Sequence, residues 1–468
     1  MKIIHAASEV YPFSKTGGLA DVAYALPLSQ GGLGHDVYVI TPLYKGILEN
    51  FPNIKYTGKK TWVDTDAGVF EFGIYTLKMK KVKFIFLSNI FLFERGGYYR
   101  EKGVDYPDNF LIFGCFAKAV LNVVKYLLKD VDIVHCHDWQ AALIPALLKT
   151  EYKDLGAKSV FTIHNLAFQG LFSLKDILKL KIDSWLFGLE CLEFYSMGNF
   201  VKSAISMADS VTTVSPSYAE EIKTPEFGFG LEGFLKKHSG KLVGIINGID
   251  SRLWNPNTDN FIFKKYSKTT YKNKLVNKIS LCKICGLDES LPLFGFVSRF
   301  TEQKGISILI EVLKEFHSEA SFVLLGDGDL EVKRELRAIE TLSGVRVFFG
   351  YNEALSRQIY AGADFYLMPS KFEPCGISQL IAMRYGCIPI VRGVGGLKDT
   401  VKDISGDSGH GIVFSNYSLE EFRIGIERGL KVYYSREFVD IAKRNMLKDF
   451  SWVNSATAYI GLYEKLLK

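Results

Sequence analysis

Short apolar runs typical of buried strands alternate with helical patterns along the whole chain. This alternation is the pattern of α/β folds built on parallel sheets. Because 468 residues exceed what a single core usually holds, we predict two doubly wound domains that face each other across a cleft. The expected strands, besides Lys2–Ala7, are 36–42, 82–89, 131–138, 158–165, 210–215 and 241–246 in the first half, and 291–298, 321–325, 345–349, 363–369, 387–391 and 411–414 in the second.

The composition changes between the two sets of strands. Asn247-Gly248-Ile249-Asp250 is followed by a polar stretch, rich in Lys and Asn, that runs to about residue 280. We therefore predict an N-terminal domain over 1–245, a C-terminal domain over 246–450 and a final helix over 451–468. Apolar residues recur at helical spacing from Trp452 to Leu467, and we expect this helix to return to the N-terminal domain.

The first strand is followed by Lys15-Thr16-Gly17-Gly18-Leu19-Ala20-Asp21, which places a lysine and two glycines where a helix begins. Free amide N–H groups and the helix dipole make such a position an anion site, and a diphosphate would suit it. The alternative is a tight glycine turn with Lys15 solvated. The segment matches neither the dinucleotide fingerprint G-x-G-x-x-G nor the P-loop, which disfavours oxidoreductases and NTPases.

Two further strand-to-helix junctions, both in the second half of the chain, contain charged residues. Arg299 and Lys304 lie five residues apart, after one strand and before the next helix. Guanidinium and ammonium groups both bind phosphate, although an ordinary solvated loop is the alternative. Glu373 follows the strand before Cys375-Gly376, where we expect the next helix to open. A carboxylate there could accept hydrogen bonds from sugar hydroxyls, or could simply cap the helix.

Composition excludes several other classes. The net charge of +6 comes from dispersed residues, so we expect no nucleic-acid partner. We see no run of about 18 uninterrupted apolar residues, and therefore expect no membrane span. The N-terminus opens directly on a strand, unlike a secretory signal. Seven cysteines, an odd number, favour reduced thiols and a cytoplasmic location.

Together, Lys15–Asp21, Arg299…Gln303-Lys304-Gly305 and Phe372-Glu373-Pro374-Cys375-Gly376 resemble the bacterial glycogen synthase and plant starch synthase family, in order and over essentially the whole chain. The resemblance implies the two-domain GT-B fold and a hexosyltransferase that moves glucose from a nucleotide sugar to an α-1,4-glucan with retention of configuration. It further implies ADP-glucose as donor, glycogen or a maltooligosaccharide as acceptor, and no metal or other cofactor. The residues themselves leave open UDP-glucose as donor, and also the oligomeric state.

The resemblance also implies roles for individual residues. Lys15, Arg299 and Lys304 would hold the donor diphosphate, and Glu373 and His164 would contact the transferred glucose. The remaining residues implied on the donor side are Gly18, Asp21, Tyr351 (stacked on the nucleobase), Cys375, Gly376 and Ser378, the last standing where bacterial members often have Thr. Those implied on the glucose and acceptor side are Asp138, Asn165 and Asn247.

Other interpretations are weaker. His135-Cys136-His137-Asp138 could suggest metal ligands, but on a strand the two histidines share one face and Asp138 points away. Ile381 stands where many other GT-B transferases carry a second glutamate, which disfavours those relatives. A non-catalytic glucan-binding protein would not need a diphosphate pocket.

Overall fold

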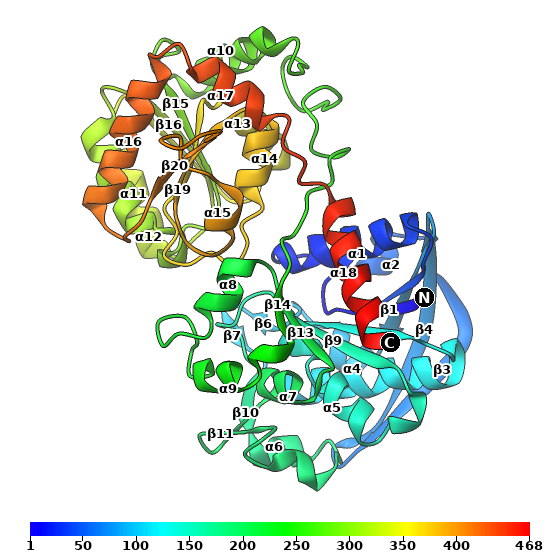
Figure 1. Cartoon of the computed structure of the whole chain (residues 1–468). Coiled ribbons are helices and arrows are strands. Elements are labelled where there is room, and N and C mark those ends of the chain that lie inside the picture. Colours follow the sequence, from blue (N-terminus) through cyan, green and yellow to red (C-terminus); the bar gives the residue numbers. More distant parts are fainter. The chain divides into compact units, whose positions relative to one another are not determined.

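The computed structural model describes residues 1–468, and the chain divides into two compact units. Unit 1 comprises Met1–Val214, Ala219–Ile246 and Trp452–Lys468. Unit 2 comprises Ser215–Tyr218 and Asn247–Ser451. Each unit is an α/β layer structure with its own sheet (Figure 1), which confirms the predicted two-domain α/β class.

Unit 1 contains a nine-stranded sheet in the order β14-β13-β9-β8-β1-β2-β5-β4-β3. Strands from β14 to β5 in this order pair in parallel and are short. All of them except the edge strand β14 are largely buried, as expected for strands covered on both faces. Their bounds are β1 (Lys2–Ala6), β2 (Asp36–Pro42), β5 (Val82–Ser88), β8 (Ile133–His137), β9 (Lys158–Ile163), β13 (Ser210–Thr213) and β14 (Leu242–Gly244).

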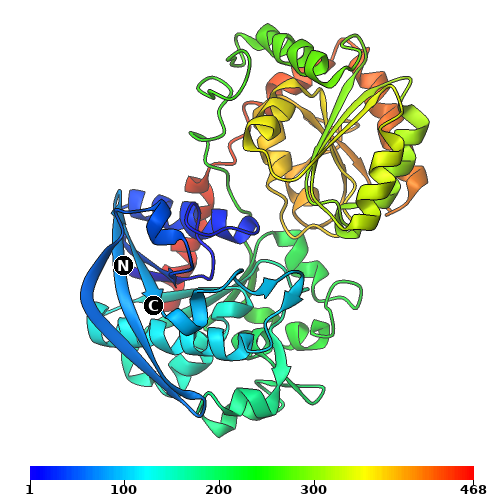
Figure 2. The ribbon, with the colours of Figure 1, turned by 180° about the vertical axis from the view of Figure 1, so that it is seen from behind.

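The edge of this sheet was missed from the sequence. β3 (Lys55–Thr65) and β4 (Gly68–Met79) form a long antiparallel hairpin, and β4 pairs antiparallel with β5. Figure 2 shows the hairpin from behind. Most side chains of β3 are exposed, so the segment lacks the continuous apolar run by which the inner strands were predicted. The sheet is therefore mixed rather than wholly parallel.

Helices cover both faces of this sheet. They are α1 (Gly18–Gly32), α2 (Ile47–Asn50), α3 (Ile90–Phe93), α4 (Asn109–Val123), α5 (Leu143–Lys149), α6 (Leu174–Leu178), α7 (Phe200–Met207) and α9 (Glu232–Lys237), while α8 (Pro216–Glu221) has residues in both units. Small strands complete the unit: β6 (Arg100–Glu101), β7 (Val104–Asp105), β10 (Leu171–Ser173), β11 (Glu193–Phe194) and β12 (Met197–Asn199).

The final helix, α18 (Trp452–Leu467), belongs to unit 1 and packs along α1. In Figure 1 it is the red helix beside the blue one. Its buried side chains recur every three or four residues and include Trp452, Tyr459 and Tyr463. This one-sided spacing confirms the predicted return of the C-terminal helix to the N-terminal domain.

One helical stretch of unit 1 passes the length and composition test for a membrane span. Asn109–Leu128 has a mean hydropathy of 1.7 over an 18-residue window, although Lys118 and Lys125 interrupt its apolar residues. Within the unit 67% of that window is buried, as is usual for a core helix. The expectation of no membrane span stays a prediction.

Unit 2 contains a six-stranded, entirely parallel sheet in the order β17-β16-β15-β18-β19-β20. The bounds are β15 (Leu293–Val297), β16 (Ser321–Gly326), β17 (Val345–Phe349), β18 (Phe365–Met368), β19 (Ile388–Arg392) and β20 (Ile412–Phe414). The helices are α10 (Lys274–Cys285), α11 (Ile306–Phe316), α12 (Leu330–Ile339), α13 (Glu353–Gly362), α14 (Ser378–Arg384), α15 (Gly395–Thr400), α16 (Leu419–Tyr433) and α17 (Phe438–Asn445).

Strand register builds the core of unit 2. Phe294 on β15 lies opposite Phe322 on β16 and Phe365 on β18. The ring of Phe294 stacks on both, at centroid distances of 5.1 and 4.9 Å. Stacked rings on three adjacent strands fix the register, because a shift of one residue would turn them to the other face.

Each sheet has a switch point, where the chain leaves two neighbouring parallel strands toward opposite edges of the sheet. In unit 1 this point lies between β1 and β8, and in unit 2 between β15 and β18. Ligands of doubly wound sheets bind beyond the carboxyl ends of the strands at such points. The loops that follow β1, β8, β15 and β18 are therefore the positions to compare with the predicted site residues.

Candidate active site

The loop after β1 carries Lys15 to the start of α1. Lys15 Nζ donates to Asp21 Oδ1 at 2.7 Å, and the two side chains are 39% and 36% exposed. Gly17 precedes the helix in extended backbone, and a Cβ added there would meet no atom within 4 Å. The glycine therefore keeps the space before the N-terminus of α1, where Gly18 is the first residue, open. Burial raises the pKa of Asp21, and the Lys15 charge opposes that shift.

A buried carboxylate that the sequence analysis did not single out holds this loop. Glu9 accepts hydrogen bonds from the Thr16 backbone amide, from Thr16 Oγ1 and from the Tyr99 hydroxyl. Tyr99 also contacts Ser8 Oγ at 3.0 Å. The segment 94–106 is thereby tied to the Lys15 loop. Nothing in the local sequence marks Glu9, because one of its partners lies 90 residues away.

Asp138 and His164 meet at the carboxyl ends of β8 and β9. Asp138 has a positive φ of 57°, a rare conformation for a residue with a side chain. Its Oδ1 accepts from the His164 amide at 2.8 Å, and its carboxylate also accepts from the Asn165 amide. Burial raises the pKa of Asp138 to about 7. Asn165 Oδ1 accepts from the Ala167 amide at 3.1 Å and turns the chain away from β9. The structure thus brings all three predicted residues together.

Four histidines, His5, His135, His137 and His164, lie close together next to this turn. His164 contacts His137, and His137 contacts His5 on the neighbouring strand, at 3.1 and 3.0 Å. Burial lowers the pKa of His164 to about 3, so its imidazole is neutral at pH 7. A neutral ring can form hydrogen bonds but cannot supply a positive charge.

Three of these imidazoles, those of His5, His135 and His137, lie close enough to share a metal ion, with ligand atoms within 4.8 Å of one another. All six of their ring nitrogens, however, have hydrogen-bond partners within the cluster or in the residues around it. These bonds make the three rings part of a hydrogen-bonded network, in which the Asp138 side chain is not a partner.

In unit 2 the predicted cation and carboxylate form one ion pair. Lys304 Nζ lies 2.5 Å from Glu373 Oε2, and the side chains are only 15% and 6% exposed. Ser370 Oγ donates to the same carboxylate oxygen at 3.1 Å. Arg299, four residues before Gln303, is exposed and donates to Gln303 Oε1 at 3.3 Å. The sequence predicted these residues separately, and their pairing across 69 positions could not be foreseen.

A glycine makes this pairing possible. Gly305 adopts a φ of 75°, and a Cβ there would lie 2.0 Å from the carbonyl oxygen of Pro369. Only glycine allows the loop after β15 to approach the loop after β18 so closely. The close approach places Lys304 beside Glu373 at the switch point of the sheet.

The loop after Glu373 differs from the prediction in one respect. Cys375-Gly376 does not open the helix, because α14 begins at Ser378. Gln379 fills the space instead and donates to the carbonyl oxygens of Cys375 and Gly376 at 3.2 and 3.0 Å. Ser378 Oγ faces Met368 Sδ at 3.4 Å. The backbone amides of 375 and 376 are therefore in a loop rather than at a helix N-terminus.

Asn247 lies against this loop. Its side chain is 4% exposed, its Oδ1 has no hydrogen-bond partner, and its backbone amide donates to the Cys375 thiol. Burial raises the pKa of that thiol to about 12, so Cys375 remains protonated. An unsatisfied buried amide oxygen is costly unless something donates to it, which suits a place reserved for a ligand.

A third glycine junction was missed. The Gly396 amide, in the first turn of α15, donates to the Glu373 carbonyl at 3.1 Å, and a Cβ at Gly396 would lie 2.1 Å from the Cys375 carbonyl oxygen. The pattern Gly393-Val394-Gly395-Gly396 after an apolar strand was the available signal.

Tyr351 lies in the loop between β17 and α13 and is 84% exposed. This position is at the carboxyl edge of the unit 2 sheet, on the side of β16 and β15. A flat, accessible ring there is able to stack on a base.

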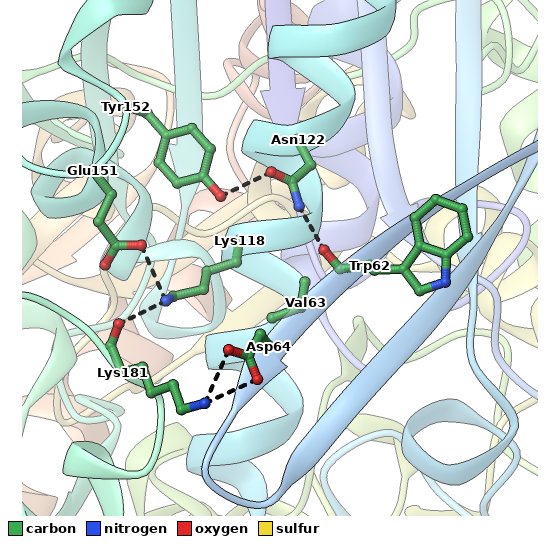
Figure 3. Close-up of a pocket in the computed structure, with 8 residues that line it drawn as sticks. All are labelled: Trp62, Val63, Asp64, Lys118, Asn122, Glu151, Tyr152 and Lys181. Carbon is green, nitrogen blue, oxygen red and sulfur yellow. Dashed lines mark hydrogen bonds and ion pairs between the residues drawn. The ribbon is translucent and has the colours of Figure 1, made fainter.

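A separate pocket of about 280 Å³ in unit 1 contains none of the predicted site residues. Figure 3 shows that its polar groups are already paired: Lys118 contacts Glu151, Lys181 contacts Asp64, and Asn122 bridges Tyr152 and the Trp62 carbonyl. These internal pairs leave few groups for a ligand, so the pocket is not the candidate active site.

Comparisons with known proteins agree with this geometry. The starch synthase catalytic domain matches residues 2–237, and the model for glycosyl transferases group 1 matches residues 281–445. Glycogen synthase 2 of Geobacter sulfurreducens is 41% identical, covering 99% of this chain and 98% of its own. Glycogen synthase of Aquifex aeolicus is 42% identical, covering 100% and 99%.

Solved structures give the same result. The catalytic domain of starch synthase IV from Arabidopsis thaliana, bound to ADP and acarbose, matches with a TM-score of 0.92 at 34% identity, covering 100% of this chain and 99% of that one. Sucrose-phosphate synthase from Thermosynechococcus elongatus shares the fold alone, with a TM-score of 0.65 at 17% identity.

Two α/β units with charged and hydrogen-bonding loops at their switch points define a glycosyltransferase of the GT-B class. Within that class, the chain belongs to the glycogen synthase and starch synthase family, which confirms the resemblance found in its motifs.

Proposed function

We propose that this glycogen synthase transfers glucose from ADP-glucose to the non-reducing end of an α-1,4-glucan, with retention of configuration and release of ADP. The observation that carries the proposal is the buried Lys304–Glu373 pair at the switch point of unit 2. A sugar diphosphate offers one group for each partner: phosphate oxygens for the ammonium and hydroxyls for the carboxylate. The structural relative that binds ADP supports the same donor class.

The leaving group is a nucleoside diphosphate, on which negative charge accumulates as the glycosyl bond breaks. Lys15, Arg299 and Lys304 neutralise that charge, the role that a divalent metal plays in other transferases. Both lysines are held by carboxylates in the free protein, Lys15 by Asp21 and Lys304 by Glu373. Donor binding therefore exchanges these internal partners for phosphate oxygens.

The sugar side uses neutral and anionic acceptors. Glu373 accepts hydrogen bonds from glucose hydroxyls, and His164 contributes a neutral imidazole, because its pKa of about 3 excludes a charged ring at pH 7. His164 consequently orients the sugar rather than balancing the diphosphate. The unpartnered Asn247 Oδ1 adds one more acceptor beside the Cys375 loop.

The bond changes balance without a catalytic carboxylate pair. The bond between the anomeric carbon and the phosphate oxygen breaks, and a bond from the same carbon to the acceptor O4 forms on the same face. The acceptor hydroxyl gives its proton to the departing phosphate. Retention follows from attack on the face that the leaving group vacates.

A reducing compartment suits this chain, and we place the enzyme in the cytoplasm. All seven cysteines are free thiols in buried positions. Several of them have raised pKa values because of burial, Cys375 among them, which keeps them protonated and unreactive.

The test is incorporation of labelled glucose into glycogen from ADP-glucose and from UDP-glucose, with EDTA added to parallel reactions. We expect faster incorporation from ADP-glucose and no effect of EDTA. Incorporation from UDP-glucose alone would overturn the donor assignment. A loss of activity with EDTA that Mg²⁺ restores would overturn the metal-free role of the three cations.

A further inference from the structure

The buried histidines of unit 1 form a continuous chain of hydrogen bonds that begins at an amide on α1. Gln30 Oε1 lies 2.7 Å from His5 Nε2, and His5 Nδ1 lies 3.0 Å from His137 Nε2. His137 Nδ1 in turn lies 3.1 Å from His164 Nε2. Gln30, His5 and His137 are fully buried, so no water competes for these bonds.

Each ring in this chain is neutral at pH 7. Burial lowers the pKa of His5 to about 4 and that of His164 to about 3, and it lowers the pKa of His137 well below its usual value. A neutral imidazole has one N–H donor and one acceptor nitrogen. Every ring must therefore donate at one end and accept at the other.

The direction of the chain follows from its first member. An amide oxygen can only accept, so His5 carries its proton on Nε2 and accepts at Nδ1. His137 must then donate from Nε2 and accept at Nδ1. His164 must donate from Nε2, which leaves its Nδ1 as an acceptor. Turning the Gln30 amide over would reverse every bond at once.

A second branch leads from the other side of the amide. Gln30 Nε2 donates to the Tyr463 hydroxyl at 3.2 Å, and that hydroxyl lies 2.6 Å from His135 Nδ1. His135 Nε2 in turn lies 2.5 Å from Thr162 Oγ1, which lies 2.6 Å from Thr212 Oγ1. In this orientation the hydroxyl receives the amide N–H and donates to His135, so Tyr463 on the C-terminal helix is the partner of the amide nitrogen.

We propose that Gln30 is a positioning residue that, through His5 and His137, sets the tautomer of His164 and makes its Nδ1 a hydrogen-bond acceptor. The inference rests on the proposed function for one point only, that His164 contacts the transferred glucose. A sugar hydroxyl at this nitrogen donates a hydrogen bond to the ring and keeps its own oxygen free to accept from elsewhere. A group that can only accept is disfavoured there, because two acceptors would face each other.

The tautomer is measured by long-range proton–nitrogen NMR of the ligand-free full chain labelled at its eight histidines. The loss of one signal set in His164→Gln assigns the residue. We expect the wild-type His164 proton on Nε2. A proton on Nδ1 would overturn the proposal, and this result requires no variant to fold.

Two variants test the control by Gln30. Gln30→Met removes the acceptor, and Tyr463→Phe releases the amide from the other side, so both should give His164 a mixture of tautomers. Gln30→Glu retains an oxygen facing His5 and should restore the Nε2 proton. Thr212→Val is the matched control, since it removes a buried hydroxyl at the far end of the other branch. An unchanged tautomer in both Gln30→Met and Tyr463→Phe would overturn the proposal.

Kinetics separate positioning from folding. We expect Gln30→Met to lower kcat about tenfold with ADP-glucose, Gln30→Glu to recover most of that loss, and Thr212→Val to behave as wild type. Losses as large in Gln30→Glu and in Thr212→Val as in Gln30→Met would indicate a structural role alone and would overturn the proposal. If the wild type transfers no glucose at all, the proposed function fails, while the NMR result still decides the tautomer.

Discussion

The two sheets present different chemistry at their switch points. In unit 1 the strand ends carry neutral groups, with the histidine chain below and the half-exposed Lys15–Asp21 pair at the rim. In unit 2 they carry a nearly buried ion pair, Lys304–Glu373, with exposed Arg299 nearby in the sequence. Both units place a lysine and a carboxylate beside glycines, but the two ion pairs contribute differently to stability because one is buried and the other is not. A half-exposed pair contributes little to stability, whereas a buried one cannot lose a partner cheaply.

The sharpest test of this comparison is Lys304→Ala. It leaves Glu373 buried without a counter-ion, and we expect unit 2 to lose about 3–5 kcal/mol of stability together with most activity. Denaturant unfolding followed by a probe in unit 2 measures the loss.

The double variant Lys304→Ala with Glu373→Ala is the control. It should recover part of the stability, because no unpaired charge remains, but none of the activity. A single variant as stable as the wild type would show that water reaches Glu373 and that the burial difference has no energetic meaning.

Lys15→Ala gives the contrasting result. Turnover should fall on the order of 10²–10³-fold through loss of a donor to the leaving diphosphate. Stability should change by less than about 1 kcal/mol, because the Lys15–Asp21 pair is half-exposed. Initial rates and thermal unfolding on the same preparation measure both effects.

Asp21→Asn controls for the loss of the ion pair itself and should affect turnover much less. Near-normal turnover in Lys15→Ala would remove Lys15 from the site, while unfolding of the variant would break the contrast with Lys304.

Asp138, at the strand ends of unit 1, allows a test by pH. Its pKa of about 7 in the folded protein is above the value near 4 that is usual for an unfolded chain. Between those values the folded state binds the extra proton, so the contribution of Asp138 to the stability of unit 1 should fall as the pH rises from about 4 to 7. The full shift corresponds to about 4 kcal/mol, and about 2 kcal/mol is expected after partial exposure is allowed for.

Asp138→Asn keeps an oxygen for the His164 amide but does not titrate. The buried histidines, whose pKa values are lowered, change the stability of both proteins over the same range, so the difference between the proteins is measured. From pH 5 to pH 7.5 the wild type should lose stability relative to Asp138→Asn. An equal slope in the variant would assign the effect to other groups.

The smallest expected effect is that of Tyr351→Ala. Stacking of an accessible ring on a base is worth about 1–3 kcal/mol, and the 84% exposure of Tyr351 suggests the low end. KM for the donor should rise about tenfold with kcat nearly unchanged, and Tyr351→Phe should match the wild type. A fall in kcat without a change in KM would exclude base stacking.

The sequence alone predicted the features of the site that are marked by a few neighbouring residues. Strand ends and glycine junctions are marked within a few residues, so Lys15, Asp138, His164, Arg299 and Glu373 were all placed on the correct loops. The same reasoning missed whatever depends on distant partners. The Lys304–Glu373 pair joins residues 69 apart, and the contact from Gln30 to Tyr463 joins residues 433 apart.

The antiparallel β3–β4 hairpin was missed for a different reason. Its exposed side chains give no apolar run, and its pairing with β5 is decided by backbone hydrogen bonds that any sequence can make. The start of α14 was predicted at Cys375-Gly376, but the helix begins at Ser378. The carbonyl oxygens of Cys375 and Gly376 accept hydrogen bonds from the Gln379 side chain, a partner that the local pattern did not reveal.

The return of α18 to unit 1 has a consequence for synthesis on the ribosome. About two hundred residues of unit 2 are translated between the last strand of the first unit and the helix that covers α1. At about 5–20 residues per second, the nascent first unit waits roughly 10–40 seconds with one apolar face uncovered. During that interval the Gln30 amide lacks the hydroxyl of Tyr463. A helix translated after unit 2 therefore completes the domain translated before it, and a chain terminated within unit 2 would expose a surface for chaperones to bind.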